Sequence, residues 1–194
     1  MDLSVLACPG CRRPGSSLVM LDPARVACAA CAATYPASDG VLDLEPDASL
    51  DTKLDVEEYA AANAAQTRLY EKCYLPFLRE AGIPADRSVC LEIGSGPGTL
   101  TVALASEFGR LYASDLSWRF LAMLRRRIPG DNVTILRFDA QRIPFRPETL
   151  HVIVGHSVLH HLLSFEETLA ACFEALQDGG IAIFGEPLYP GAAL

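Results

Sequence analysis

No apolar run in this chain of 194 residues reaches the roughly 18 residues that a membrane-spanning helix needs. The chain also lacks an excess of positive charge, because 16 lysines and arginines stand against 24 aspartates and glutamates, for a net charge of −8. The segment from Met1 to Ser4 has neither the basic start nor the apolar core of a secretory signal. We therefore expect a cytoplasmic protein without a membrane span, and the acidic balance argues against nucleic acid as a partner.

Four of the seven cysteines form two pairs of equal spacing. Two residues separate Cys8 from Cys11 and Cys28 from Cys31, and sixteen residues lie between the pairs. This spacing is typical of a zinc ribbon, in which four thiolates surround Zn²⁺ in a tetrahedron. Four thiolates leave no open coordination position, so we expect a structural metal. The alternative, two disulfides, is disfavoured in a cytosolic chain.

The composition changes along the chain and predicts three segments. Residues 1–46, rich in Cys, Pro and Gly, are the expected zinc ribbon, and residues 47–56 are a polar, acidic linker. Residues 57–194 form the second domain, and a helical pattern over 56–81 is expected to split or kink at Pro76. Strands and helices then alternate, which predicts an α/β fold with a doubly wound, mostly parallel sheet. The expected strands are 89–93, 111–114, 133–138, 151–155 and 181–184, and the expected helices are 98–108, 117–128 and 165–177.

The first of these strands runs into a glycine-rich turn, Gly94-Ser-Gly-Pro-Gly98, after which a helix begins. Such a turn brings backbone N–H groups up to a small ligand. A dinucleotide would require a third glycine where Thr99 stands, and Pro97 removes an N–H that a pyrophosphate would use. Glu92 places a negative charge just before the turn. The turn is therefore predicted to hold a cationic ligand rather than a pyrophosphate.

Carboxylates stand at or near the ends of three successive strands. Asp115 follows Glu92 by twenty-three residues, ends the second strand, and would accept hydrogen bonds from both hydroxyls of a ribose. Asp139 ends the third strand and would accept from the exocyclic amine of an adenine, while Glu92 would hold an ammonium directly or through water. Each carboxylate has a simpler interpretation as a cap of the next helix. Together they describe a nucleoside that carries positive charge.

These motifs resemble those of class I S-adenosylmethionine-dependent methyltransferases. Leu91-Glu-Ile-Gly-Ser-Gly-Pro-Gly-Thr99 is similar to the first motif, Ala113-Ser-Asp-Leu-Ser117 to the ribose motif, and Phe138-Asp-Ala-Gln-Arg-Ile-Pro-Phe145 to the adenine motif. Residues 152–162 and 176–187 resemble the motifs of the fourth and fifth strands. The resemblance implies a Rossmann-like fold with S-adenosylmethionine as cofactor. It assigns to the cofactor the residues Glu92, Gly94, Ser95, Gly96, Gly98, Thr99, Asp115, Leu116, Asp139, Ala140 and His156.

The sequence departs from this family in its length. The family has seven strands, of which the last two form a hairpin at one sheet edge, and the eight residues after Glu186 are too few for them. The fifth strand would then be a bare apolar edge. We expect a fragment, a truncated gene product, or a chain whose edge is covered by a partner or another copy. The N-terminal block, in turn, is similar to the zinc ribbon of some bacterial members.

Methyl transfer requires orientation more than acid–base chemistry, because a sulfonium already activates the methyl group. A hydroxyl acceptor would still benefit from a base that titrates near neutrality. His156, His160 and His161 lie near the end of the fourth strand and are the catalytic candidates, with packing of the following loop as the alternative for the last two. Tyr59 and Tyr70 either close over the cofactor or pack in the core.

Three functions remain open at this point. The sequence favours methyl transfer to a small-molecule acceptor. An RNA methyltransferase is an alternative, because a ribosomal RNA guanine methyltransferase family also combines a zinc ribbon with this fold. The third is a non-catalytic protein that binds the cofactor or a partner. The N-terminal block speaks against RNA, because it has three arginines against five carboxylates.

Overall fold

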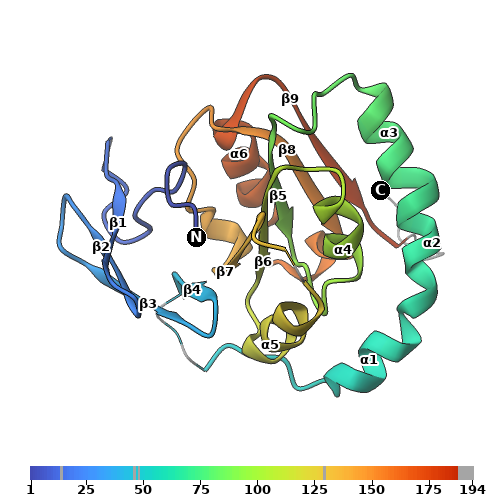
Figure 1. The fold of residues 1–194 in the computed structure, drawn as a ribbon, viewed down its shortest axis with the longest axis horizontal. Coiled ribbons are helices and arrows are strands. Elements are labelled where there is room, and N and C mark those ends of the chain that lie inside the picture. The colour runs from blue at the N-terminus through green and yellow to red at the C-terminus, as the bar shows by residue number, and fades with distance from the viewer. Residues whose placement is uncertain (14, 46, 48, 129, 188–194) are drawn as a thin grey trace.

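The computed structural model describes residues 1–187 except residues 14, 46, 48 and 129, and a single sheet runs through them (Figure 1). Its strands are β1 (Leu18–Asp22), β2 (Arg25–Cys28), β3 (Thr34–Ser38), β4 (Val41–Asp43), β5 (Val89–Ile93), β6 (Arg110–Asp115), β7 (Val133–Arg137), β8 (Leu150–His156) and β9 (Leu176–Gly185). The α-helices are α1 (Val56–Ala62), α2 (Thr67–Leu69), α3 (Leu75–Glu80), α4 (Thr99–Ala105), α5 (Trp118–Arg127) and α6 (Phe165–Ala175). Shorter helical turns are η1 (Ala64–Gln66), η2 (Tyr70–Tyr74), η3 (Ala140–Arg142) and η4 (Leu159–His161).

The strand order is β1-β2-β3-β4-β7-β6-β5-β8-β9, and every pairing from β4 to β9 is parallel. This confirms the predicted α/β fold with a mostly parallel sheet. The direction of chain progression reverses beside β5, because β6 and β7 lie on one side of it and β8 and β9 on the other. Ligands of such sheets bind at this reversal, outside the carboxyl ends of the strands.

The N-terminal block continues the main sheet. Strands β1 to β4 form antiparallel pairs, and β4 then pairs in parallel with β7 through Leu42 opposite Leu136 and Asp43 opposite Arg137. Figure 1 shows this block at one end of the sheet, in blue. The sequence showed a strand near Val41, whereas its partner lies more than ninety residues away and was not predicted.

The helical region over 56–81 is divided differently from the expectation. The break lies at Asn63, whose amide Nδ2 donates to the Tyr59 carbonyl, and a 3₁₀ turn follows. Pro76 stands in the first turn of α3, where its missing N–H costs little, and a π-helical turn, η2, precedes it. The interruption is therefore upstream of the proline.

The last described strand also differs from the expected one. A single strand, β9, replaces the predicted turn over 178–180 and strand over 181–184. Leu176 pairs with Leu150, but the next pair is Ile181 with Val152, so the register with β8 shifts between them. The residues predicted as a glycine turn lie at this shift in register. Within the described residues β9 pairs only with β8. The predicted second domain ends at residue 194, and its last seven residues lie outside the described part of the chain.

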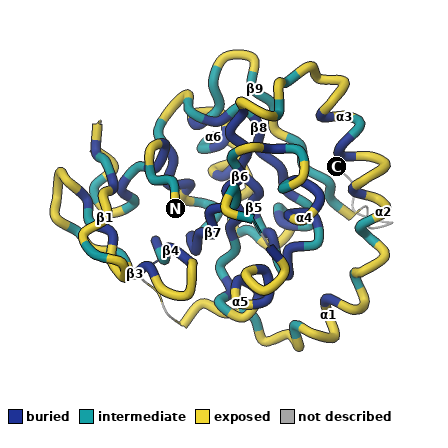
Figure 2. Tube along the Cα trace, in the orientation of Figure 1, coloured by how far each residue is buried: buried dark blue, intermediate teal, exposed yellow. Residues whose placement is uncertain are grey.

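Alternation along β5 separates the two faces of the sheet. Val89, Leu91 and Ile93 join a buried cluster with α6 and the N-terminal block, whereas Cys90 joins the cluster beneath α3 and α4. Figure 2 shows the buried centre of the sheet and the exposed outer side of α1 to α3. Among the described residues, no helix has the length and apolar character to span a membrane.

Candidate functional site

Two adjoining cavities of about 400 and 110 Å³ open at the carboxyl ends of β5, β6, β7 and β8. They share five lining residues, Tyr59, Gly94, Gly96, His156 and Ser157, so we treat them as one cleft with a larger and a smaller chamber. Both chambers lie at the reversal of chain order beside β5. The cleft is therefore where an open α/β sheet binds its ligand.

The glycine turn after β5 forms the floor of the cleft. Gly94 has φ +69°, and a Cβ there would stand 2.7 Å from Val158 Cγ2. Gly98 has φ +85° and packs against Leu124, which leaves it behind the cleft wall as the N-cap of α4. Both positions need a residue without a side chain, because the left-handed conformation is strained for others. Ser95 and Thr99, also predicted to contact the ligand, line the smaller chamber.

Glu92 is the buried acid of the smaller chamber. Its side chain is 2% exposed, and Oε2 has no hydrogen-bond partner within the described residues. Burial, as the main cause, and the nearby Asp115 charge raise the pKa of Glu92 to about 8. The hydroxyl of Ser95, which lines the same chamber, is also buried and has no hydrogen-bond partner within the described residues. Two unsatisfied polar atoms on residues that line one chamber indicate a polar ligand, because such burial is costly.

Asp115 lies between the end of β6 and the glycine turn. Its carboxylate accepts from the Gly96 amide at 2.8 Å through one oxygen and from the Ser117 amide at 2.9 Å through the other. Burial raises the pKa of Asp115, and these backbone N–H groups act in the opposite direction. The side chain thus fixes the turn and still lines the larger chamber. Asp115 can therefore accept from the backbone amide before α5, as the capping interpretation predicted, and still be close enough to a ligand in the larger chamber to contact it.

Asp139 lies in the larger chamber together with Leu116 and Ala140. Its carboxylate accepts from the Gln141 amide at 3.0 Å and thereby caps η3. The structure thus shows the capping role and leaves the side chain at the cavity wall. Of the eleven residues predicted to bind the cofactor, ten line the two chambers, and Gly98 supports the turn from behind.

The three candidate histidines have different surroundings. His156 lines both chambers, forms a 2.8 Å hydrogen bond between its Nδ1 and the Tyr74 hydroxyl, and has a pKa that burial lowers. His161 lines the larger chamber, and burial also lowers its pKa. His160 pairs with Glu186, its Nδ1 lying 2.6 Å from Oε2, and is not part of the cavity lining. The geometry therefore separates His156 from the other two as the residue shared by both chambers.

Several cleft residues escaped the sequence reasoning. Thr52 and Leu54, taken as linker, line the larger chamber, and Phe120 packs on Tyr59 with ring centroids 5.2 Å apart. Gln66 lines the smaller chamber and accepts a hydrogen bond from Tyr70. Of the two tyrosines considered above, Tyr70 is buried in the cluster beneath α3 and α4, whereas Tyr59 is exposed and lines both chambers. Closure over the cofactor stays a prediction. The amphipathic pattern over 56–81 was the signal for these residues, but the face that meets the cleft depends on where the helix breaks.

The four paired cysteines converge at the other end of the molecule. Their sulfurs all lie within 4.8 Å of one another, and the distances from Cys8 to Cys31 and from Cys11 to Cys28 are both 3.8 Å. A Zn–S bond of about 2.3 Å in a tetrahedron implies S–S edges of about 3.8 Å. The Tyr35 hydroxyl lies 3.0 Å from Cys8 Sγ and accepts from the Gly10 amide. All four cysteines are free of disulfides, and the arrangement fits a zinc ribbon.

The family model described as a methyltransferase domain matches residues 91–184. This range begins in the strand before the glycine turn and ends in β9, so it covers the cleft just described. Residues 91–184, slightly under half of the chain, are therefore similar to a methyltransferase domain. The match supports S-adenosylmethionine as the ligand of the cleft.

Curated relatives agree with this methyltransferase domain at low identity. An uncharacterized chloroplastic methyltransferase of Arabidopsis thaliana is 22% identical over 94% of this chain and 61% of its own length. A malonyl-[acyl-carrier protein] O-methyltransferase of Chlorobium luteolum is 30% identical over 65% of this chain and 49% of its own. A protein of Thermococcus onnurineus, named as a probable ribosomal RNA small subunit methyltransferase A, is 41% identical over 30% of this chain and 22% of its own. The chain thus spans about three fifths or less of the length of these relatives.

Among solved structures, a SAM-dependent methyltransferase from Aquifex aeolicus has a TM-score of 0.55 and 19% identity, covering 64% of this chain and 69% of that one. At this identity the likeness shows the fold of the methyltransferase domain.

The cleft residues fit S-adenosylmethionine. The unpartnered oxygen of Glu92 suits an ammonium, and Asp115 presents a carboxylate beside the glycine turn for ribose hydroxyls. Apolar side chains of the larger chamber, among them Phe138 and Leu162, suit an adenine ring. Among the described residues, no arginine or lysine lines either cavity, which agrees with a cationic ligand rather than a phosphate.

Proposed function

We propose that this chain transfers a methyl group from S-adenosylmethionine to a small-molecule acceptor. The observation that carries the proposal is the buried Glu92 carboxyl, which has an oxygen without a partner among the described residues beside an aromatic-lined chamber. The cofactor supplies a methyl group on a sulfonium, and the chain's own residues orient it and exclude water. The four-cysteine block would hold a structural Zn²⁺ that maintains the end of the sheet.

His156 is the residue we assign to the acceptor side. The Tyr74 hydroxyl occupies its Nδ1, so Nε2 is the ring nitrogen left for an acceptor. The lowered pKa keeps the imidazole neutral near pH 7. In the tautomer whose Nδ1–H donates to the Tyr74 oxygen, Nε2 carries no hydrogen and can take a proton from a hydroxyl. An acceptor that is already nucleophilic needs only the orientation. His161, in the wall of the larger chamber, is the second candidate for such contact, and His160 is assigned to the loop through Glu186.

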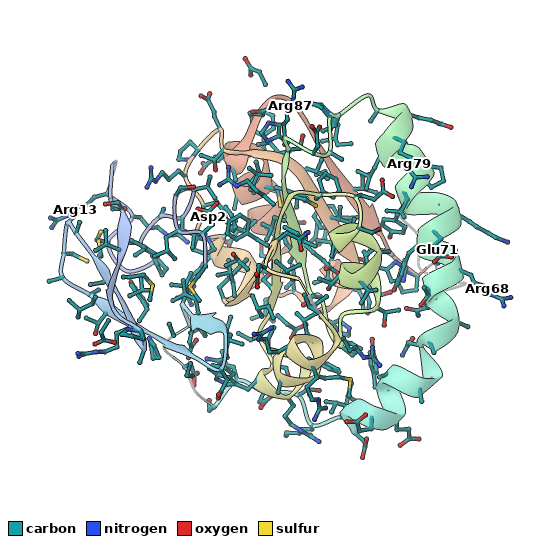
Figure 3. All side chains as sticks on the ribbon, in the orientation of Figure 1. Asp2, Arg13, Arg68, Glu71, Arg79 and Arg87 are labelled. Carbon is teal, nitrogen blue, oxygen red and sulfur yellow. The ribbon has the colours of Figure 1, made fainter. Side chains whose placement is uncertain are left out.

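The relatives support a small acceptor in part. The Chlorobium protein is named as an O-methyltransferase that acts on a malonyl-[acyl-carrier protein]. The acidic charge of this chain agrees with a non-nucleic-acid substrate. Figure 3 shows Arg13 and Arg68 at opposite ends of the molecule, so these cations do not form a stripe along which RNA would lie.

RNA methylation is the second candidate, because the Thermococcus protein, over a short stretch, has the highest identity among the relatives described above. A direct screen separates the two functions. The purified chain is incubated with S-adenosylmethionine labelled in its methyl group, and with either a small-metabolite extract or total RNA. Label in small molecules supports our proposal. Label in RNA, with RNA association that weakens steeply as salt rises, favours the second candidate.

Binding is tested first, by titration calorimetry with S-adenosylhomocysteine. Micromolar binding by the wild type, together with a loss of methyl transfer in His156→Gln that is much larger than its loss of binding, supports the assigned roles. If S-adenosylhomocysteine does not bind the folded wild-type chain, the proposal is wrong. Binding without transfer to either acceptor pool would instead support a non-catalytic, cofactor-binding protein.

A further inference from the structure

Arg137, at the end of β7, is fully buried and has all five of its N–H donors engaged. Nε donates to the Leu116 carbonyl at 2.8 Å, and Nη1 donates to the Asp43 carboxylate and to the Glu45 carbonyl, each at 3.1 Å. Nη2 donates to the carbonyls of Asp47 at 2.7 Å and Leu50 at 2.9 Å. A single guanidinium thus binds β4, the segment after it and the loop after β6.

Some of the acceptors of Arg137 lie in or next to the wall of the cofactor cleft. Leu116 lines the larger chamber, and the segment that contains Asp47 and Leu50 continues into Thr52 and Leu54 in the same wall. We call the described residues from Asp43 to Leu54, a set that leaves out residues 46 and 48, the clamp segment. Because a buried guanidinium without acceptors is costly, ordering of the clamp segment and ordering of the Leu116 loop favour each other.

Arg137 is also connected to the cysteine cluster, through strands β4 and β3. Asp43 pairs with Arg137 in the parallel β4–β7 ladder, and the Leu44 amide donates to the Arg137 carbonyl at 2.8 Å. Strand β4 pairs with β3, and Tyr35 on β3 contacts Cys8 Sγ. A loose cysteine cluster therefore loosens β3 and β4, and with them the acceptors of Arg137.

We propose that Arg137 is a positioning residue that couples metal binding at the four cysteines to cofactor binding in the cleft. Metal at the cluster orders β3 and β4, Arg137 transmits this order to the clamp segment and Leu116, and the cofactor binds a wall that is already formed. By thermodynamic reciprocity the cofactor then tightens metal binding by the same factor. The inference rests on the proposed function only in that the cleft binds S-adenosylmethionine or its product.

A second route between the two sites exists and serves as the competing explanation. Cys8 and Cys28 share a buried apolar cluster with Leu91 and Ile93 of β5, which precedes the glycine turn. Coupling through this core would not depend on the guanidinium. A lysine at position 137 distinguishes the routes, because it retains a positive charge beside Asp43 but cannot serve five acceptors at once.

The experiment measures zinc affinity of the full chain by equilibrium competition with a chromogenic chelator, with and without saturating S-adenosylhomocysteine. The matching measurement is the affinity for S-adenosylhomocysteine, by calorimetry, at high and low zinc occupancy. In the wild type both affinities should change by the same factor, about fivefold or more. In Arg137→Lys both ligands should still bind, with the factor reduced to about twofold or less.

Arg146→Lys is the matched control. Arg146 also joins the N-terminal block, since its Nε donates to the Leu6 carbonyl at 3.2 Å, but it does not contact the clamp segment or Leu116 through any contact described here. This variant should retain the wild-type coupling. Equal coupling in wild type and Arg137→Lys overturns the inference in favour of the core route.

Hydrogen exchange on the unmodified protein gives a second readout, and S-adenosylhomocysteine should increase protection of β3 and β4.

The outcomes are separable. If S-adenosylhomocysteine binds but leaves zinc affinity and β3–β4 exchange unchanged, the coupling is wrong and the proposed function stands. If S-adenosylhomocysteine does not bind the zinc-loaded wild type at all, the proposed function and the coupling are both wrong. If Arg137→Lys is too unstable to purify, Asp43→Ala takes its place, because it removes one acceptor of the guanidinium and should also reduce the coupling factor. An unchanged factor in that variant overturns the inference.

Discussion

The Asp115 carboxylate accepts a hydrogen bond from the Gly96 amide at 2.8 Å, and this contact ties the end of β6 to the glycine turn after β5. The two residues come from adjacent parallel strands whose carboxyl ends meet at one sheet edge. One side chain thereby sets the conformation of the turn and stands in the wall of the larger chamber. Removing it should affect both stability and ligand binding.

Asp115→Ala should weaken S-adenosylhomocysteine binding by about tenfold or more, because charge-assisted hydrogen bonds contribute roughly 1.5–3 kcal/mol each. It should also lower the free energy of unfolding by about 1–2 kcal/mol, because two backbone amides lose their acceptor. Calorimetry and urea denaturation measure the two effects. The control is Asp22→Ala, which removes an acceptor of the Ala24 amide far from the cleft and should leave the Kd within about twofold. Unchanged binding in Asp115→Ala would contradict the role of this residue.

Glu92 should make ligand binding release a proton. Its pKa of about 8 means that the free protein holds a proton there at pH 7, and a ligand ammonium nearby lowers that pKa. Titrations in two buffers of different ionisation enthalpy should report release of about half a proton or more per ligand at pH 7. Glu92→Gln should abolish this release, and Glu107→Gln, at an exposed ion pair with Arg79, should keep it. Equal release in all three proteins would show that the proton comes from elsewhere.

The same carboxyl sets the sign of the pH dependence of stability in the ligand-free protein. Its pKa rises on folding from 4.5 to about 8, so the native state keeps a proton that the unfolded chain has lost. The contribution is complete below about pH 4.5 and is lost as the pH rises toward 8, at up to about 1.4 kcal/mol per pH unit. Urea midpoints measured across this range should fall less steeply in Glu92→Gln. A steeper fall in that variant would contradict the assignment.

Gly98 should tolerate alanine less well than Gly82. Both have positive φ, at +85° and +71°, so each alanine variant incurs the cost of the left-handed conformation, about 1 kcal/mol. A Cβ at Gly98 would also overlap Leu124 Cδ1, whereas a Cβ at Gly82 meets nothing within 4 Å. Overpacking adds about 1–3 kcal/mol, so Gly98→Ala should be the less stable variant by that amount in urea. Equal stabilities would mean that Leu124 moves aside freely.

The cysteine cluster should bind one zinc per chain, as measured by elemental analysis after gel filtration. Cys8→Ser should bind less than a tenth of an equivalent and melt at a lower temperature, by about 6–12 °C if the loss is about 3 kcal/mol. Cys73→Ser is the control, because Cys73 is exposed and outside the cluster. Zinc retained at one equivalent by Cys8→Ser would show that the metal lies elsewhere.

Local pattern was enough to predict much of the site. The two cysteine pairs, the glycine turn and the carboxylates of Glu92 and Asp115 are spaced along the chain as their chemistry requires, because each motif is a short loop anchored by its own strand. The parallel sheet followed from the alternation of strands and helices. Those predictions depend on neighbours in sequence, where propensity and periodicity act.

The tertiary structure alone decided the contacts between distant segments. No local pattern predicts that Val41–Asp43 joins β7, that Tyr74 forms a hydrogen bond with His156, or that Arg137 binds the segment after β4. From sequence alone, an arginine such as Arg137 is expected at the surface. Its five hydrogen-bond acceptors come from segments up to 94 residues away, and they offset the cost of burying its charge. The sequence by itself determined which chemistries this protein carries, and the packing of the N-terminal block on the sheet determined how they are connected.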